Sequence, residues 1–185
     1  MTLDLSVVNS ADVLFNEVEN KLGQASILVN NAAYCTETGI DNFSAGALDK
    51  HYEINLKATT LLTIAFIKRF NLGQGGRIIN LTSGQSLGEM SNEIAYAITK
   101  GAVETLTKTI SQSIAPKGIT INAVNPGPTD TGWMDEQLAT AILEKSPMGR
   151  IATPKDAARL VAFLASDEAE WITGQVIHSE GGFKR

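Results

Sequence analysis

The sequence predicts an α/β protein in which a doubly wound parallel sheet carries helices on both faces. Short apolar segments that resemble buried strands alternate with longer segments whose apolar residues repeat at helical spacing. The strand segments are apolar almost throughout, which is typical of parallel strands covered on both faces. With 185 residues, of which 43% are hydrophobic, the chain is expected to form one domain over residues 1–185.

The predicted elements follow in a regular order. Ser10 is expected to cap a helix over Ala11–Leu22, and Gly23 to end it. Three further helices are expected over Leu48–Phe70, over Glu93–Ala115 and after Thr153-Pro154, where Asp156 completes a capping box. Four buried strands are expected at Ile27–Asn30, Arg77–Leu81, Ile119–Val124 and Gln175–His178.

Composition excludes several classes of function. Fifteen Lys and Arg against 20 Asp and Glu give a net charge of −5, so neither nucleic acid nor an acidic membrane is an expected partner. The single cysteine, Cys35, cannot form an internal disulfide, and with only two distant histidines no metal site is expected. No apolar stretch is long enough to span a bilayer, and the first ten residues do not resemble a signal peptide. We therefore expect a cytoplasmic protein.

Ser83, Tyr96 and Lys100 form the sharpest candidate for a catalytic group. Tyr96 and Lys100 are four residues apart on a predicted helix, so their side chains share a face. A nearby ammonium lowers the pKa of a phenol, and this would make Tyr96 a usable general acid and base. Ser83 ends the preceding strand, where a parallel sheet presents its ligands. Alone the pair is weak: it arises by chance with a probability of about 0.16, and a surface Tyr–Lys contact is the alternative.

Further motifs strengthen this interpretation. In order, they are Asn30-Asn31-Ala32-Ala33, Asn55, Asn80-Leu81-Thr82-Ser83, Tyr96 with Lys100, Asn125-Pro126-Gly127, and Ile172-Thr173-Gly174-Gln175 before Gly181-Gly182. Over Leu3–Phe183 the chain thereby resembles the classical short-chain dehydrogenase/reductase family, including the 13-residue separation of Ser83 and Tyr96. It is most similar to the 3-oxoacyl-acyl-carrier-protein reductases. The resemblance implies a Rossmann-like sheet.

The resemblance also implies an activity and a role for each matching residue. The expected activity is hydride transfer between NADP or NAD and a small-molecule carbonyl or secondary alcohol. Tyr96 would exchange the proton, Lys100 would lower its pKa and hold the nicotinamide ribose, and Ser83 would orient the substrate. Asn55 would hold a water that links Lys100 to solvent, or else simply bond helix backbone. The long helices would pair between subunits, so a homodimer or homotetramer is expected.

Cofactor contacts are implied at residues beyond the catalytic group. Asp4 would lie beside the adenine ring, although a solvated terminal Asp is the alternative. The segment Trp133–Met148 would be a mobile lid over the substrate. The alternative is that its apolar residues, which repeat at helical spacing, only pack against the rest of the protein. The full set of expected cofactor-binding residues is Asp4, Asn30, Ala32, Tyr96, Lys100, Pro126, Gly127, Thr129 and Thr131.

The family's front segment has no counterpart. The first glycine is Gly23, so no Gly-x-x-x-Gly-x-Gly turn is present to bind a pyrophosphate. We expect the chain to start inside the family's third strand, at Thr2–Leu5, without the first two strand–helix units. The edge of the strand Ile27–Asn31 would then be exposed. The 185 residues on their own would bind a dinucleotide only weakly. The alternative function is a truncated remnant that acts only as a folding or binding partner. Substrate, reaction direction and the choice of NAD or NADP are left open.

Overall fold

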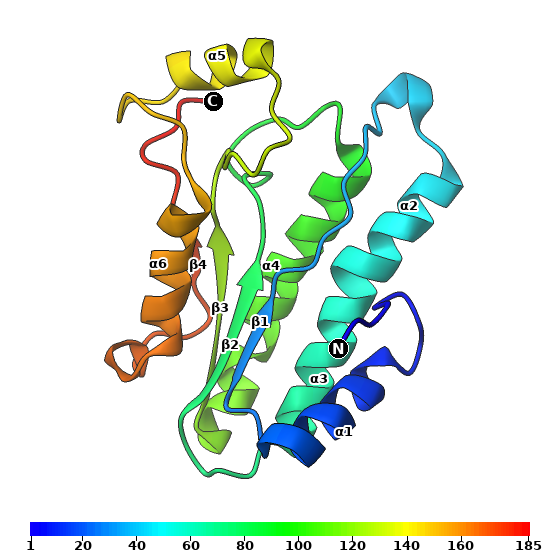
Figure 1. Cartoon of the computed structure of the whole chain (residues 1–185), viewed down its shortest axis with the longest axis vertical. Helices are drawn as coiled ribbons and strands as arrows, with labels where there is room; N and C mark the ends of the chain where they lie inside the picture. The colour runs from blue at the N-terminus through cyan, green and yellow to red at the C-terminus, as the bar shows by residue number, and fades with distance from the viewer.

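The computed structural model describes residues 1–185 and contains one sheet of four parallel strands (Figure 1). The strand order is β1-β2-β3-β4, so neighbours in the sequence are neighbours in the sheet. The bounds are β1 (Ile27–Asn30), β2 (Gly76–Leu81), β3 (Ile119–Asn125) and β4 (Val176–His178). All four predicted strands are confirmed, with ends that differ by at most one residue from the prediction.

Helices connect the strands and account for every predicted helical segment. Their bounds are α1 (Ser10–Leu22), α2 (Ala45–His51), α3 (Thr59–Arg69), α4 (Ile94–Ile114), α5 (Glu136–Glu144) and α6 (Pro154–Ala165). Short 3₁₀ turns occupy Ile40–Asn42, Ala115–Lys117 and Asp167–Ala169. Thr153 and Asp156 form the expected capping box at the start of α6. No helix combines the length and the hydropathy that a membrane span requires.

Two hydrophobic clusters lie on opposite faces of the sheet. Successive strand residues point to opposite faces, so Ile78 belongs to the cluster formed with α1, α3 and α4, whereas Ile79 packs with α6. Figure 1 shows the same division, with α6 on one side of the sheet and α3 and α4 on the other. The predicted fold class is thereby confirmed. At the edge strand β1, Ile27 and Val29 remain 46% and 41% exposed.

Three local predictions are wrong. Thr2–Leu5 is not a strand, because no other strand lies beside it to exchange backbone hydrogen bonds; Leu5 packs on the cluster around α1 instead. Ser10 is the first residue of α1 rather than its cap, and its hydroxyl donates to the carbonyl of Leu5. The expected helix over Leu48–Phe70 starts earlier, at Ala45, and is π-helical over Tyr52–Ala58 between α2 and α3.

Candidate functional site

The segments that follow the strands meet at one edge of the sheet. Because the strands are parallel and paired, with Asn30 opposite Asn80 and Asn80 opposite Ala123, their carboxyl ends lie together. This edge is where an open α/β sheet binds ligands. Figure 1 shows it at the top, beneath α5.

Tyr96 and Lys100 lie on the first turns of α4, beside the end of β2. Lys100 is 3% exposed, and its Nζ donates a hydrogen bond to the carbonyl of Leu81 at 2.7 Å. The same Nζ lies 5.6 Å from the centre of the Tyr96 ring. The Ser83 hydroxyl lies near enough to the Tyr96 phenol to lower its pKa, and it lies 3.9 Å from the sulfur of Met90. The structure thus brings together the three residues that the sequence singles out.

Burial controls the charges in this group, and the direction differs from the expected one. Desolvation raises the pKa of Tyr96 to about 12, helped by Cys35 and Glu93 and opposed by the Ser83 hydroxyl. Desolvation also lowers the pKa of Lys100 to about 8. For Tyr96, burial therefore outweighs any lowering of the pKa by the ammonium of Lys100, because desolvation favours the neutral form of a buried group. At neutral pH the phenol keeps its proton.

Asn55 joins two segments of the site. It is fully buried in the π-helical segment, a kind of turn that is frequent at functional sites. Its side chain accepts from the backbone N–H of Tyr34 at 2.7 Å and donates to the Tyr34 carbonyl at 2.8 Å. It also donates to Thr99 Oγ1 at 3.2 Å. Its partners are thus the loop after β1 and α4, rather than the backbone of its own helix.

Asn30 braces the sheet through its side-chain amide. Its Nδ2 donates to Thr63 of α3 at 3.1 Å and to Asn80 of β2 at 2.8 Å, while Asn80 donates to Thr107 of α4 at 3.0 Å. Its Oδ1 is buried and has no hydrogen-bond partner. Ala32 is exposed, and together with Asn30 it lines a cavity of about 140 Å³.

The loop after β3 begins with a turn that requires glycine. Gly127 has a φ of +65°, and a Cβ there would lie 3.0 Å from the side chain of Glu180. Its N–H donates to Asn125 Oδ1, which closes a tight turn directly after the strand. Thr129 donates to the carbonyls of Pro126 and Gly127. Pro126, Gly127 and Thr129 therefore lie at the same sheet edge as Tyr96; Thr131 follows them on an exposed stretch.

The segment Trp133–Met148 is mostly exposed. It contains α5, in which only Ile142 is buried, whereas Trp133 and Met148 are 58% and 69% exposed. Within this chain the apolar side chains of the segment are therefore largely uncovered.

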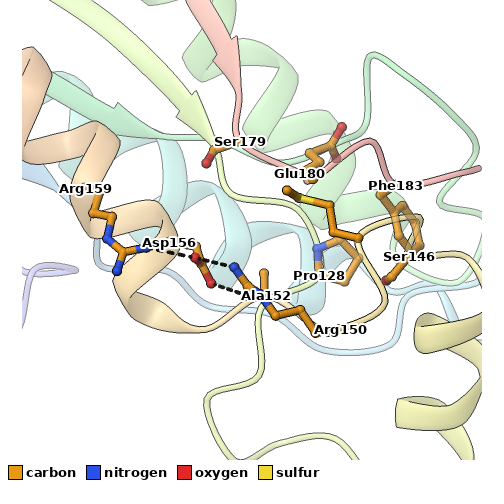
Figure 2. Close-up of a pocket in the computed structure, with 11 residues that line it drawn as sticks. Pro128, Ser146, Arg150, Ala152, Asp156, Arg159, Ser179, Glu180 and Phe183 are labelled. Carbon is orange, nitrogen blue, oxygen red and sulfur yellow. Dashed lines mark hydrogen bonds and ion pairs between the residues drawn. The ribbon is translucent and has the colours of Figure 1, made fainter.

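Beside this segment, a cavity of about 340 Å³ opens between the loop after β3, α6 and the C-terminal residues (Figure 2). Its lining is mainly polar and includes Arg150 bonded twice to Asp156. Ser83, Tyr96 and Lys100 do not line it.

The acidic residues Asp4 and Glu104 have contrasting surroundings. Asp4 is exposed and bonds Ser6, whose N–H and hydroxyl lower the pKa of this carboxyl, as in a solvated terminal turn. Glu104 was missed, although it is buried and bonds the segment that carries Ser83. The available signal was spacing, because Tyr96, Lys100 and Glu104 follow one another at intervals of four on one helix.

Known proteins match the chain over almost its whole length. The family model described as Enoyl-(Acyl carrier protein) reductase matches residues 1–184. An uncharacterised oxidoreductase of Bacillus subtilis, YjdA, is 52% identical over 187 residues, which cover 100% of this chain and 74% of that protein. The 3-oxoacyl-[acyl-carrier-protein] reductase FabG of Rickettsia conorii is 38% identical over 96% of this chain and 76% of its own.

Solved structures agree with these matches. The angucycline C-6 ketoreductase LanV with bound NADP superposes with a TM-score of 0.89 at 31% identity, over 97% of this chain and 73% of its own. A short-chain dehydrogenase/reductase of Serratia marcescens gives a TM-score of 0.92 at 28% identity, over 100% and 76% of the two chains. The matching family model, the relatives and the fold agree: this chain belongs to the short-chain dehydrogenase/reductase family of oxidoreductases and resembles its 3-oxoacyl-acyl-carrier-protein reductases.

Proposed function

We propose that the chain is a carbonyl reductase that uses NADPH or NADH and takes the proton for the product alcohol from Tyr96. One observation carries the proposal. Ser83, Tyr96 and a buried Lys100 lie together at the carboxyl ends of parallel strands, with the ammonium 5.6 Å from the phenol ring. A surface Tyr–Lys contact would leave the lysine exposed.

Residues of the chain fit part of a nicotinamide cofactor. The ammonium of Lys100 has three donors and uses one of them on Leu81, so others are free for ribose hydroxyls. The loop Pro126–Thr131 would hold the nicotinamide end, and Asn30 and Ala32 would line the adenosine side. The unpaired, buried Oδ1 of Asn30 supports this assignment, because a buried acceptor normally has a donor. When bound, the cofactor supplies the hydride to the carbonyl carbon.

The resting protonation state of Tyr96 is the one that carbonyl reduction uses. With a pKa of about 12, Tyr96 is protonated at neutral pH and can donate to the alkoxide that forms from the carbonyl. Ser83 would donate a hydrogen bond to the same oxygen, and the Lys100 ammonium would stabilise the resulting phenolate. We also propose that Asn55 holds the water that returns a proton from solvent. Asn55 bonds Thr99, which directly precedes Lys100 in the sequence.

The relatives suggest the kind of substrate. Some relatives are named 3-oxoacyl-[acyl-carrier-protein] reductases, and one similar structure is that of an angucycline C-6 ketoreductase. These names point to two groups of ketones, 3-oxoacyl thioesters and polycyclic ketones. The exposed Trp133 and Met148 would cover such a substrate as part of a lid.

Ketone-dependent consumption of NADPH or NADH tests the proposal. Cofactor should be supplied at millimolar concentration, because the chain carries no glycine-rich turn for the pyrophosphate. The variant Tyr96→Phe should lower kcat by about 10²-fold or more, the usual contribution of a positioned acid. The control Lys108→Ala alters an exposed side chain on the same helix and should leave kcat unchanged. A folded chain that reduces neither ketone group would favour the alternative of a binding partner without activity.

We further propose that the chain assembles as a homodimer or homotetramer. Apolar side chains on neighbouring helices remain uncovered: Tyr52 and Leu61 are 48% and 38% exposed, and Ile98 of α4 is 57% exposed. Helices that one sheet face already covers need a second partner for such a surface. Light scattering at micromolar concentration should give the mass of a dimer or tetramer, and a clean monomer would contradict the proposal.

A further inference from the structure

Glu104 is a buried carboxylate that none of the steps above uses. It lies on α4 one turn after Lys100 and is 6% exposed. It takes part in none of the ion pairs of the molecule. A carboxylate without a cation is costly to bury unless hydrogen bonds compensate it. What its hydrogen bonds hold in place therefore indicates its role.

The partners of Glu104 all come from one segment. Its Oε1 accepts hydrogen bonds from Gln85 Nε2 at 2.6 Å, from Thr82 Oγ1 at 3.2 Å and from Ser86 Oγ at 3.3 Å. These three residues flank Ser83 on both sides, directly after β2. Hydrogen bonds to a charged acceptor are the stronger kind, so this carboxylate restrains the Thr82–Ser86 segment at three points.

Lys100 holds the same segment from the preceding turn of α4. Its Nζ bonds the carbonyl of Leu81, and its own carbonyl shares the single hydroxyl proton of Thr82 with Glu104, each at 3.2 Å from Oγ1. The hydroxyl of Ser83 has only a weak contact of its own with the sulfur of Met90, at 3.9 Å. Its location relative to Tyr96 therefore depends on how its neighbours are held.

We infer that Glu104 is a positioning residue: through Thr82, Gln85 and Ser86 it fixes Ser83 opposite Tyr96. The inference rests on the proposed function for the role of Ser83, and it adds a residue that does not touch the substrate. Misplacement of a reacting group by about 1 Å can cost roughly 10²-fold in rate. Loss of the carboxylate should thus lower kcat, with little effect on KM for the cofactor.

Three variants test the inference against a merely structural role. Glu104→Leu leaves the donors of Gln85, Thr82 and Ser86 without their acceptor, so it should lower the thermal midpoint, and kcat measured where the variant is still folded should fall by about 10-fold or more. Glu104→Gln retains an acceptor and should recover kcat to within about 3-fold. Lys108→Ala, an exposed position on the same helix, is the matched control and should change neither quantity.

A double variant and an exchange measurement complete the test. If Glu104 acts through Ser83, then Ser83→Ala with Glu104→Leu should be no slower than Ser83→Ala alone, because coupled residues are not additive. Effects that multiply, or an unchanged kcat in Glu104→Leu, would overturn the inference. Amide hydrogen exchange of residues 82–88 gives a readout that needs no activity, and it should accelerate in Glu104→Leu but not in Lys108→Ala. If the parent chain shows no reductase activity, the proposed function fails, and unchanged exchange would separately refute the positioning by Glu104.

Discussion

The buried ammonium of Lys100 predicts a pH-dependent stability that one substitution should remove. Lys100 is 3% exposed, and burial lowers its pKa from the ordinary 10.5 to about 8. Between these two values the unfolded chain keeps the proton that the folded chain releases. Stability rises with pH wherever the unfolded state binds more protons, so this lysine should add stability as pH rises above 8.

The size of the effect follows from the two pKa values. From about pH 7 to about pH 9.5, a group with pKa values of about 8 when folded and 10.5 when unfolded adds about 2 kcal/mol to the free energy of unfolding. Lys100→Met keeps the length of the side chain and removes the titration. The variant also leaves the Leu81 carbonyl without its donor, at a cost of about 1–3 kcal/mol. That cost is the same at both pH values and cancels in the comparison.

Urea unfolding of the parent and of Lys100→Met at about pH 7 and about pH 9.5 measures the difference. The parent should gain about 2 kcal/mol relative to the variant at the higher pH. Lys108→Met, exposed on the same helix, should follow the parent. The same pH dependence in parent and Lys100→Met would refute the reasoning, because the ammonium would then not be desolvated in the folded chain.

Two further substitutions test contacts at the sheet edge. Asn55→Ala removes the partners of both Tyr34 backbone groups and of Thr99, so it should lower the free energy of unfolding by about 2–5 kcal/mol; a loss below about 1 kcal/mol in urea unfolding would contradict the described bonds. Gly127→Ala places a Cβ at a φ of +65° and 3.0 Å from Glu180, so it should cost about 1–3 kcal/mol, and an unchanged thermal midpoint would argue against this turn.

The sequence predicts most of the fold because its signals are local and periodic. Continuous apolar segments identify β1 to β4, and the chemistry of Thr153 and Asp156 identifies the start of α6. The π-helical segment Tyr52–Ala58 escaped prediction, since one widened turn barely disturbs a helical repeat. The failure at Thr2–Leu5 has another cause, because pairing of a strand depends on a neighbour rather than on its own residues.

The candidate site is likewise predictable from the sequence only in part. The spacing of Tyr96 and Lys100 predicts a shared face, and that face is found. The direction of their pKa values depends on how deeply the fold buries them, which no local pattern reveals. The partners of Glu104 lie about 20 residues away, so its role requires the structure even though its helical spacing is visible in the sequence.

The side-chain hydrogen bonds that Asn30 and Asn80 form across the sheet have a consequence for how the strands align. Asn30 of β1 lies opposite Asn80 of β2, and each side chain continues to a threonine, Thr63 on α3 and Thr107 on α4. The apolar neighbours of these asparagines could pack against many partners in either strand, so they select no particular pairing.

A slip of β1 by one residue would turn the amide of Asn30 to the opposite face of the sheet. Asn30 would then lose its bonds to Asn80 and to Thr63, while Asn80 would keep Thr107 but lose its donor from β1, at about 1–3 kcal/mol for each unpaired group. Asn30, Asn80 and Thr63 thus select a single pairing of β1 with β2 from among those that the apolar residues alone would accept.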